Sequence, residues 1–293
     1  MAPFPLNSKS HNHSRSNSLP SKPHPITVEC NESLARFWAC DASFSCSLLS
    51  CKLRDLQDLH DCIEKLVHLP LTQEVLFQER QEKWVDELLD GSLGFLDVCT
   101  AAKDALLHTK ECTRELQSIL RRRRGGEVEP TTEVKKFLTS RKVVRKAILK
   151  ALGNMRSLAS KCNVSLTNKD HQTGALFGLL KDIEVVTLSI FESLLKFISG
   201  STQAKQSSWS LVSKLRHSQR VACIEADENE FAKVDAALQS FVFAMTSKSD
   251  SIKNLQSQLE KMESCIQELE EGLECLFRRL IKIRVTLLNI LNH

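Results

Sequence analysis

A strict apolar repeat runs through residues 250–291. Apolar side chains recur there at alternating spacings of three and four residues: Ile252, Leu255, Leu259, Met262, Ile266, Leu269, Leu273, Leu276, Leu280, Ile283, Leu287 and Ile290. A sustained 3.5-residue repeat is typical of a long helix with one apolar seam, as in a coiled coil. The flanking residues include Cys265, Gly272 and Phe277, where a free-standing coiled coil prefers charges. We therefore favour a seam that packs inside a bundle of the same chain over a parallel dimer.

Other residues divide the rest of the chain into further helices. Five of the seven prolines lie within residues 1–28 and the chain has no tyrosine, so its leucine-rich body favours helices over strands. Pro70 ends one helix, Thr72 is a candidate cap for the next, and Gly91 with Gly94 permit a break in it. Helices are expected over residues 48–69, 72–120, 132–161, 173–199, 208–215, 228–246 and 250–291.

These patterns predict an all-α fold, an elongated bundle of long antiparallel helices with the heptad-patterned helix at its C-terminal end. A single helical-bundle domain is expected over residues 29–293. Residues 1–28 contain six serines, five prolines and no acidic residue. We expect them to form a disordered tail, because they offer too little apolar surface to offset the entropy of ordering.

Charge is unevenly distributed along the chain. Residues 121–169 contain 14 basic and 3 acidic residues, and residues 225–275 contain 4 basic and 12 acidic residues, although the net charge of the whole chain is only +4. Segments of opposite charge are expected to lie near each other and to complement each other in the fold.

The cysteines and the apolar stretches exclude several classes of protein. The eleven cysteines include no CxxC pair, whereas a zinc site usually shows two closely spaced ligand pairs. We expect reduced, mostly buried thiols and no metal or other cofactor. No stretch of 18 uncharged apolar residues occurs, so no membrane span is expected and a cytoplasmic protein is favoured.

One stretch gathers the residue types of acid–base chemistry. The sequence "DLQDLHDCIE" contains Asp55, Asp58, His60, Asp61 and Glu64. Acid–base catalysis requires such groups to converge in a desolvated cleft, which a single helix does not show, so a solvated helix face is the favoured interpretation. The chain also lacks a P-loop, an HExxH motif and a GxSxG motif, and we predict that it is not an enzyme.

Basic residues form a candidate surface for anions. They are Arg121, Arg122, Arg123, Arg124, Lys142, Arg145 and Lys146. Such a cluster attracts anionic lipid headgroups or a nucleic-acid backbone. Nucleic acid ranks below lipid, because Phe137 is the only nearby aromatic residue for stacking on bases. The favoured alternative is that these residues cap helices and pair with the acidic segment.

The N-terminal stretch "RSNSLP" places Arg15 three residues before Ser18 and Pro20 two residues after it. This pattern resembles the phosphoserine motifs that 14-3-3 proteins bind, in which the added phosphate is gripped by basic side chains of the reader. We hypothesise that Ser18 is a phosphorylation switch. A chance match in a serine-rich tail and a plastid transit peptide are the alternatives.

Several long stretches resemble the BYPASS-like family of plant proteins. They are "PLNSKSHNHSRSNSLPSKPHP", "KWVDELLDGSLGFLDVC", "AKDALLHTKECTRELQS", "LRRRRGGE", "SSWSLVSKL", "KVDAAL" and "CIQELEEGLECLFRRLIKIRVTLLNILNH". The resemblance spans nearly the whole chain and departs from the family at "ARFWACDASFSCSLL". It implies a protein of root and shoot development, and it implies no reaction, cofactor or catalytic residue.

These observations together favour a non-enzymatic helical protein with a regulatory or scaffold role, which binds protein partners, among them a phosphoserine reader. The alternative is a peripheral membrane protein that binds anionic lipid through the basic region 121–150. The sequence leaves the oligomeric state open.

Overall fold

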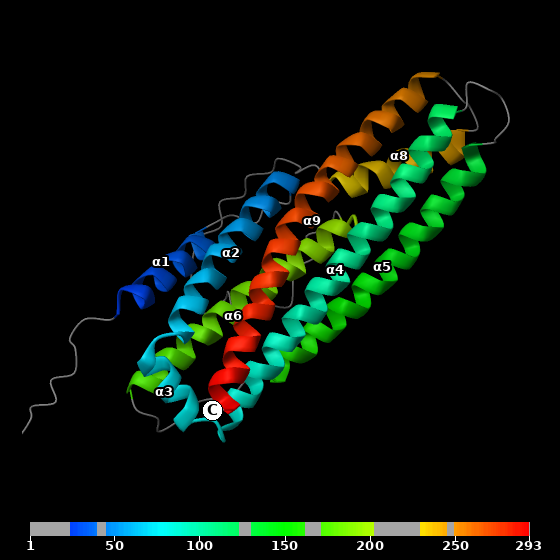
Figure 1. Cartoon of the computed structure of the whole chain (residues 1–293). Coiled ribbons are helices and arrows are strands. Elements are labelled where there is room, and N and C mark those ends of the chain that lie inside the picture. The colour runs from blue at the N-terminus through cyan, green and yellow to red at the C-terminus, as the bar shows by residue number, and fades with distance from the viewer. Residues whose placement is uncertain are drawn as a thin grey trace, which may run out of the picture.

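The computed structural model describes residues 24–39, 45–122, 130–161, 171–201, 229–244 and 249–292. Within these residues the fold is all-α and contains no strand, which confirms the predicted fold class. Its helices are α1 (Pro25–Ala39), α2 (Cys46–Val67), α3 (Pro70–Gln78), α4 (Lys83–Arg122), α5 (Pro130–Lys161), α6 (His171–Ile198), α8 (Glu230–Ala244) and α9 (Ser249–Asn292). Figure 1 shows an elongated bundle in which α4, α5 and α9 run along most of its length.

Side-chain contacts fix the directions of the long helices. Contacts between α2 and α9 join residues whose numbers rise together along both helices: Gln57 with Gly272, Asp61 with Arg279, and Glu64 with Lys282. Ion pairs between α4 and α9 join residues whose numbers run in opposite directions: Lys103 with Glu274, Lys110 with Glu270, Arg114 with Glu263, and Arg121 with Glu260. Helix α9 is therefore parallel to α2 and antiparallel to α4, and α5 lies antiparallel beside α4 (Figure 1).

The apolar seam of α9 forms the centre of the core. Its residues from Leu255 to Leu287 are buried, and Ile252 and Ile290 at its two ends pack against the core while remaining partly exposed. The main neighbours of α9 are α2, α4 and α8 of the same chain. The seam thus lies inside the bundle, as expected from its uncharged flanking residues.

The first described helix, α1, was not predicted, because the first helix expected from the sequence began at residue 48. Helix α1 starts at Pro25, so the expectation that all of residues 1–28 form a disordered tail is wrong for residues 24–28. Proline suits the first turn of a helix, where its missing N–H is not needed. His24 caps this turn, because its Nδ1 accepts from the N–H of Ile26 at 3.2 Å and its carbonyl accepts from the N–H of Thr27 at 2.9 Å.

Two expectations about the next helices are also wrong. Helix α3 begins at Pro70 with Leu69 as its N-cap, and Thr72 is buried within the helix instead of capping it. Helix α4 runs without a break through Gly91 and Gly94. Gly94 lies where α5 comes close, since a Cβ atom at this position would stand 2.3 Å from Cδ1 of Leu158. The glycine therefore serves helix packing and does not end the helix.

The predicted pairing of opposite charges is confirmed in part. Arg141 and Arg145 of the basic segment pair with Asp235, and Arg121 pairs with Glu260 at 3.6 Å. The other glutamates that α9 directs toward α4 pair with Lys103, Lys110 and Arg114, which precede the predicted basic segment. No helix in the described part of the chain is long and apolar enough to cross a membrane.

Candidate functional site

A buried arginine of α5 bonds to three other helices, α4, α6 and α8, at one region of the bundle. The side chain of Arg141 in α5 is 1% exposed, and its Nε and Nη2 atoms each donate at 3.2 Å to one carboxylate oxygen of Asp235 in α8. Nη2 also donates at 2.8 Å to the carbonyl of Ile198, the last residue of α6. Burial lowers the pKa of Arg141, whereas the charge of Asp235 raises it. The arginine therefore ties the end of α6 and the middle of α8 to α5.

Arg145, one helical turn further along α5, belongs to the same cluster. It donates to the Asp235 carboxylate, and its Nε donates at 2.9 Å to the carbonyl of Ser199. Gly200 follows with φ of +72°, a left-handed conformation that glycine adopts without strain. Arg145 was expected on the anion-binding surface, but it points inward to this cluster and does not lie on the outer face with Lys142 and Lys146.

The outer face of α5 carries a row of four other basic residues. We define the basic face as Lys135, Lys142, Lys146 and Lys150, which are all exposed. Their spacings of seven and four residues place them along one side of the helix. Two large apolar side chains lie beside this row, Val143 at 60% exposure and Leu149 at 68%. This face is cationic along its length with apolar flanks.

The other predicted basic residues lie at the end of α4 or beyond it. Arg121 is exposed and pairs with Glu260, and Arg122 donates at 3.3 Å to the carbonyl of Ser118 and at 2.9 Å to its hydroxyl. Arg123 and Arg124 lie outside the described residues, and so do Arg15, Ser18 and Pro20 of the predicted phosphoserine motif. The Ser18 hypothesis remains a prediction.

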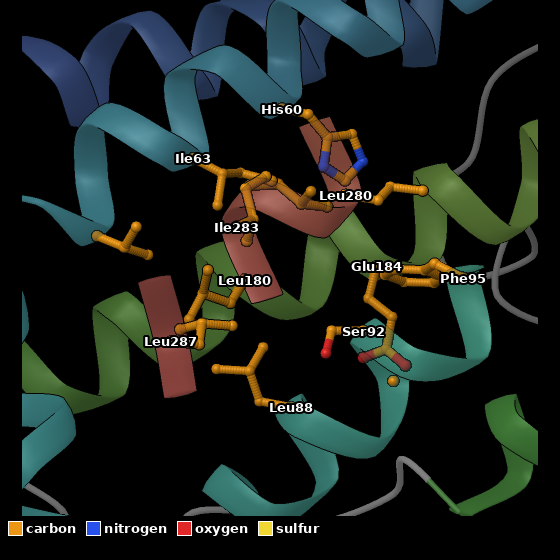
Figure 2. Close-up of a pocket in the computed structure, with 13 residues that line it drawn as sticks. His60, Ile63, Leu88, Ser92, Phe95, Leu180, Glu184, Leu280, Ile283 and Leu287 are labelled. Carbon is orange, nitrogen blue, oxygen red and sulfur yellow. The ribbon is translucent and has the colours of Figure 1, made fainter. Parts of the chain in front are cut away.

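An internal cavity of about 50 Å³ lies among α2, α4, α6 and α9. Figure 2 shows the imidazole of His60 projecting from α2 toward Leu280, with Ser92 of α4 and Glu184 of α6 on the opposite side of the cavity. Most of the other lining residues are aliphatic. A cavity of this size accommodates a few water molecules.

His60 is buried, so the expectation that it lies on a solvated helix face is wrong. The hydroxyl of Thr187 donates to the carbonyl of Ile183 at 2.8 Å, and its oxygen can therefore accept from Nε2 of His60 at 3.2 Å. This assigns the proton of the neutral ring to Nε2 and leaves Nδ1 as an acceptor, for which the protein provides no donor in the described part of the chain. Burial is the main reason that the pKa of His60 falls to about 4.

The polar groups opposite His60 are held by other contacts. Ser92 donates its hydroxyl to the carbonyl of Leu89 at 2.7 Å and accepts from Nη1 of Arg284 at 2.7 Å. Glu184 accepts from Lys181 at 3.1 Å. The bond from Arg284 links α9 to α4 beside the cavity, whereas the bond from Lys181 lies within α6.

The described cysteines are free and most of them are buried, as predicted. Burial raises the pKa of Cys30 and of Cys99 to about 12, so both are protonated and unreactive thiols at neutral pH. Within the described residues, no group of three or more histidine, cysteine, aspartate or glutamate side chains is placed to hold a metal ion.

Sequence reasoning missed the Arg141 cluster, because it weighed the charges of α5 without asking which of them share a helix face with the buried apolar residues. Phe137, Val144 and Ile148 recur at helical spacing, and Arg141 falls on the same side of the helix. This spacing was the signal in the sequence that could have predicted that Arg141 is buried.

Comparison with known proteins agrees with the resemblance drawn from the sequence. No curated protein and no solved structure matches the chain. The model of one protein family, described as Protein BPS1, matches residues 52–290, which include nearly all of the bundle from α2 to α9. The chain therefore belongs to the BPS1 family.

Proposed function

We propose that the chain is a non-enzymatic regulatory scaffold, which presents the basic face of α5 to an anionic partner on a rigid helical bundle. We further propose that it acts in root and shoot development, the processes that its family resemblance implies. The proposed docking role rests on one observation. Helix α5 turns its two central arginines inward to Asp235 and turns Lys135, Lys142, Lys146 and Lys150 outward.

The pairing of charges elsewhere in the bundle supports this proposal. The cations that α4 directs toward α9 each have a glutamate partner, and Arg141 and Arg145 share Asp235. Among the described residues, the basic face has no carboxylate within ion-pair distance, and Glu133, the only acidic residue of α5, pairs with Lys136 at 2.7 Å. The four lysines are therefore available for an external partner.

The groups around the internal cavity support a role without catalysis. His60 is kept neutral and donates to Thr187, and the hydroxyl of Ser92 is committed to Leu89 while its oxygen accepts from Arg284. A hydroxyl nucleophile needs a general base that takes its proton. The Ser92 hydroxyl instead donates to a backbone carbonyl, so these bonds fit a structural role in joining helices.

The docking role is tested by charge reversal in plant tissue. The full chain is expressed as wild type, as K142E/K146E, and as the control K253E/K261E, which reverses two exposed lysines of α9. Each extract is fractionated by size and by sedimentation at low salt. We expect the wild type and the control to fractionate with a larger assembly and K142E/K146E to be released from it. The same distribution for all three proteins would contradict docking through α5.

A further inference from the structure

The basic face forms a straight row on a single long helix. From Lys135 to Lys150 the spacings are seven, four and four residues, so at 1.5 Å per residue the row is about 22 Å long. Helix α5 lies at the edge of the bundle beside α4, as Figure 1 shows. The row is therefore long enough for its lysines to contact several anionic groups of an extended surface at the same time.

The side chains beside this row are apolar. Val143 and Leu149 are more than half exposed and lie one residue away from Lys142 and Lys150. An exposed helix face that combines lysines with aliphatic side chains fits the boundary between lipid headgroups and acyl chains, where the cations meet phosphates and the apolar groups enter the upper hydrocarbon.

We propose that the basic face of α5 binds the surface of a bilayer rich in anionic lipid; this inference rests on the docking role proposed above. Lysine is a hydrated point charge on a flexible stem, and it suits a diffuse layer of anionic headgroups. The planar fork of arginine is favoured where a carboxylate or phosphate is bound through two parallel hydrogen bonds, and Arg141 and Arg145 are turned inward.

Nucleic acid fits this face less well than a bilayer does. Proteins that bind single strands stack bases on exposed aromatic rings. Phe137, the aromatic residue nearest to the row in sequence, is buried in the core. The apolar groups that the face does expose are aliphatic, and these favour contact with lipid.

Flotation of the full chain with vesicles tests the proposal. One vesicle preparation contains phosphatidylcholine alone, and the other contains about 30% phosphatidylserine in phosphatidylcholine. Each lysine near an anionic surface strengthens binding by about fivefold. We expect binding to the phosphatidylserine vesicles, about 30-fold or more weaker binding of K142E/K146E, and wild-type binding of K253E/K261E. A second variant, V143S/L149S, is expected to bind more weakly without a change in its salt dependence.

The outcomes separate this inference from the docking role. Equal flotation with both vesicle preparations, or wild-type flotation of K142E/K146E, overturns the membrane proposal. If that variant is nevertheless released from its assembly in plant extracts, docking through α5 stands and the partner is an acidic protein. If K142E/K146E stays with its assembly in plant extracts and also binds phosphatidylserine vesicles as strongly as the wild type, both proposals are wrong. Circular dichroism of each variant establishes that the bundle remains folded.

Discussion

Arg141 of α5 and Asp235 of α8 form a bidentate ion pair in the interior of the bundle, with side-chain exposures of 1% and 6%. The guanidinium also donates to the carbonyl that ends α6 and lies over the ring of Phe231, whose centroid is 5.2 Å from Cζ. Because neither charge of the pair is solvated, each needs the other to offset the free-energy cost of its burial.

We predict that D235N strongly destabilises the protein. The substitution leaves the guanidiniums of Arg141 and Arg145 close together with no countercharge, and an uncompensated buried charge costs about 3–5 kcal/mol. The free energy of unfolding, measured in urea, should fall by that amount. The control is E263Q, which breaks the more exposed pair with Arg114 and should cost about 1 kcal/mol or less. Similar losses for the two variants would contradict the prediction.

Two glycine substitutions are predicted to have opposite effects. Gly200 has φ of +72°, and a Cβ atom there would stand 3.0 Å from an Asp235 carboxylate oxygen. G200A should therefore destabilise the fold by about 1–3 kcal/mol. Gly153 lies exposed within α5, and a Cβ atom at this position would meet nothing within 4 Å, so G153A should stabilise the fold by about 0.5–1 kcal/mol. Thermal unfolding of both variants checks the two signs.

The positions of most helices could be predicted from the sequence, because the patterns that define them are local. The apolar repeat of α9 and Pro130, which is the first residue of α5, predicted both helices within a few residues. The predicted cap at Thr72 was wrong, because proline also starts helices. The predicted break at Gly91 and Gly94 was wrong, because glycine also permits close helix packing, and the contact of Gly94 with Leu158 that shows this role is tertiary.

The candidate sites were less predictable than the helices. Lys142 and Arg145 are both basic residues of one segment, yet one lies on the surface and the other bonds to Asp235, ninety residues further along the chain. His60 looked like part of a solvated acidic face, but the helix turns it toward Thr187. Such assignments depend on which distant helix lies against each face, and this is a tertiary property.

Phosphorylation of Ser18 remains a prediction from the sequence alone. The motif with Arg15 and Pro20 predicts that a fraction of the full chain purified from plant tissue carries phosphate on Ser18. Mass spectrometry of the intact protein and of its N-terminal peptides measures this directly. S18A should lose binding to a 14-3-3 protein, whereas S8A in the same tail should keep it. Removal of the N-terminal residues in the purified protein would instead favour a transit peptide and would contradict the switch.

His60 predicts a specific loss of stability in acid. The pKa of its buried ring is about 4 in the folded protein, compared with 6.5 for an ordinary histidine, mainly because burial disfavours the charged form. The unfolded chain therefore binds the proton first. The stability that the neutral ring contributes is fully present above about pH 6.5 and is lost as the pH falls through 4, by roughly 3 kcal/mol in all.

The variant H60F isolates this effect. Phenylalanine has a similar shape and does not titrate, so the free energy of unfolding of H60F should decline less than that of the wild type between pH 7 and pH 4. Urea unfolding at several pH values in this window measures the difference between the two proteins. Carboxylates such as Glu29 and Glu274 contribute equally to both and cancel, because hydrogen bonds lower their pKa in both proteins, mainly from Cys62 to Glu29 and from Lys103 to Glu274. Parallel curves for the two proteins would show that His60 is not buried in its neutral form.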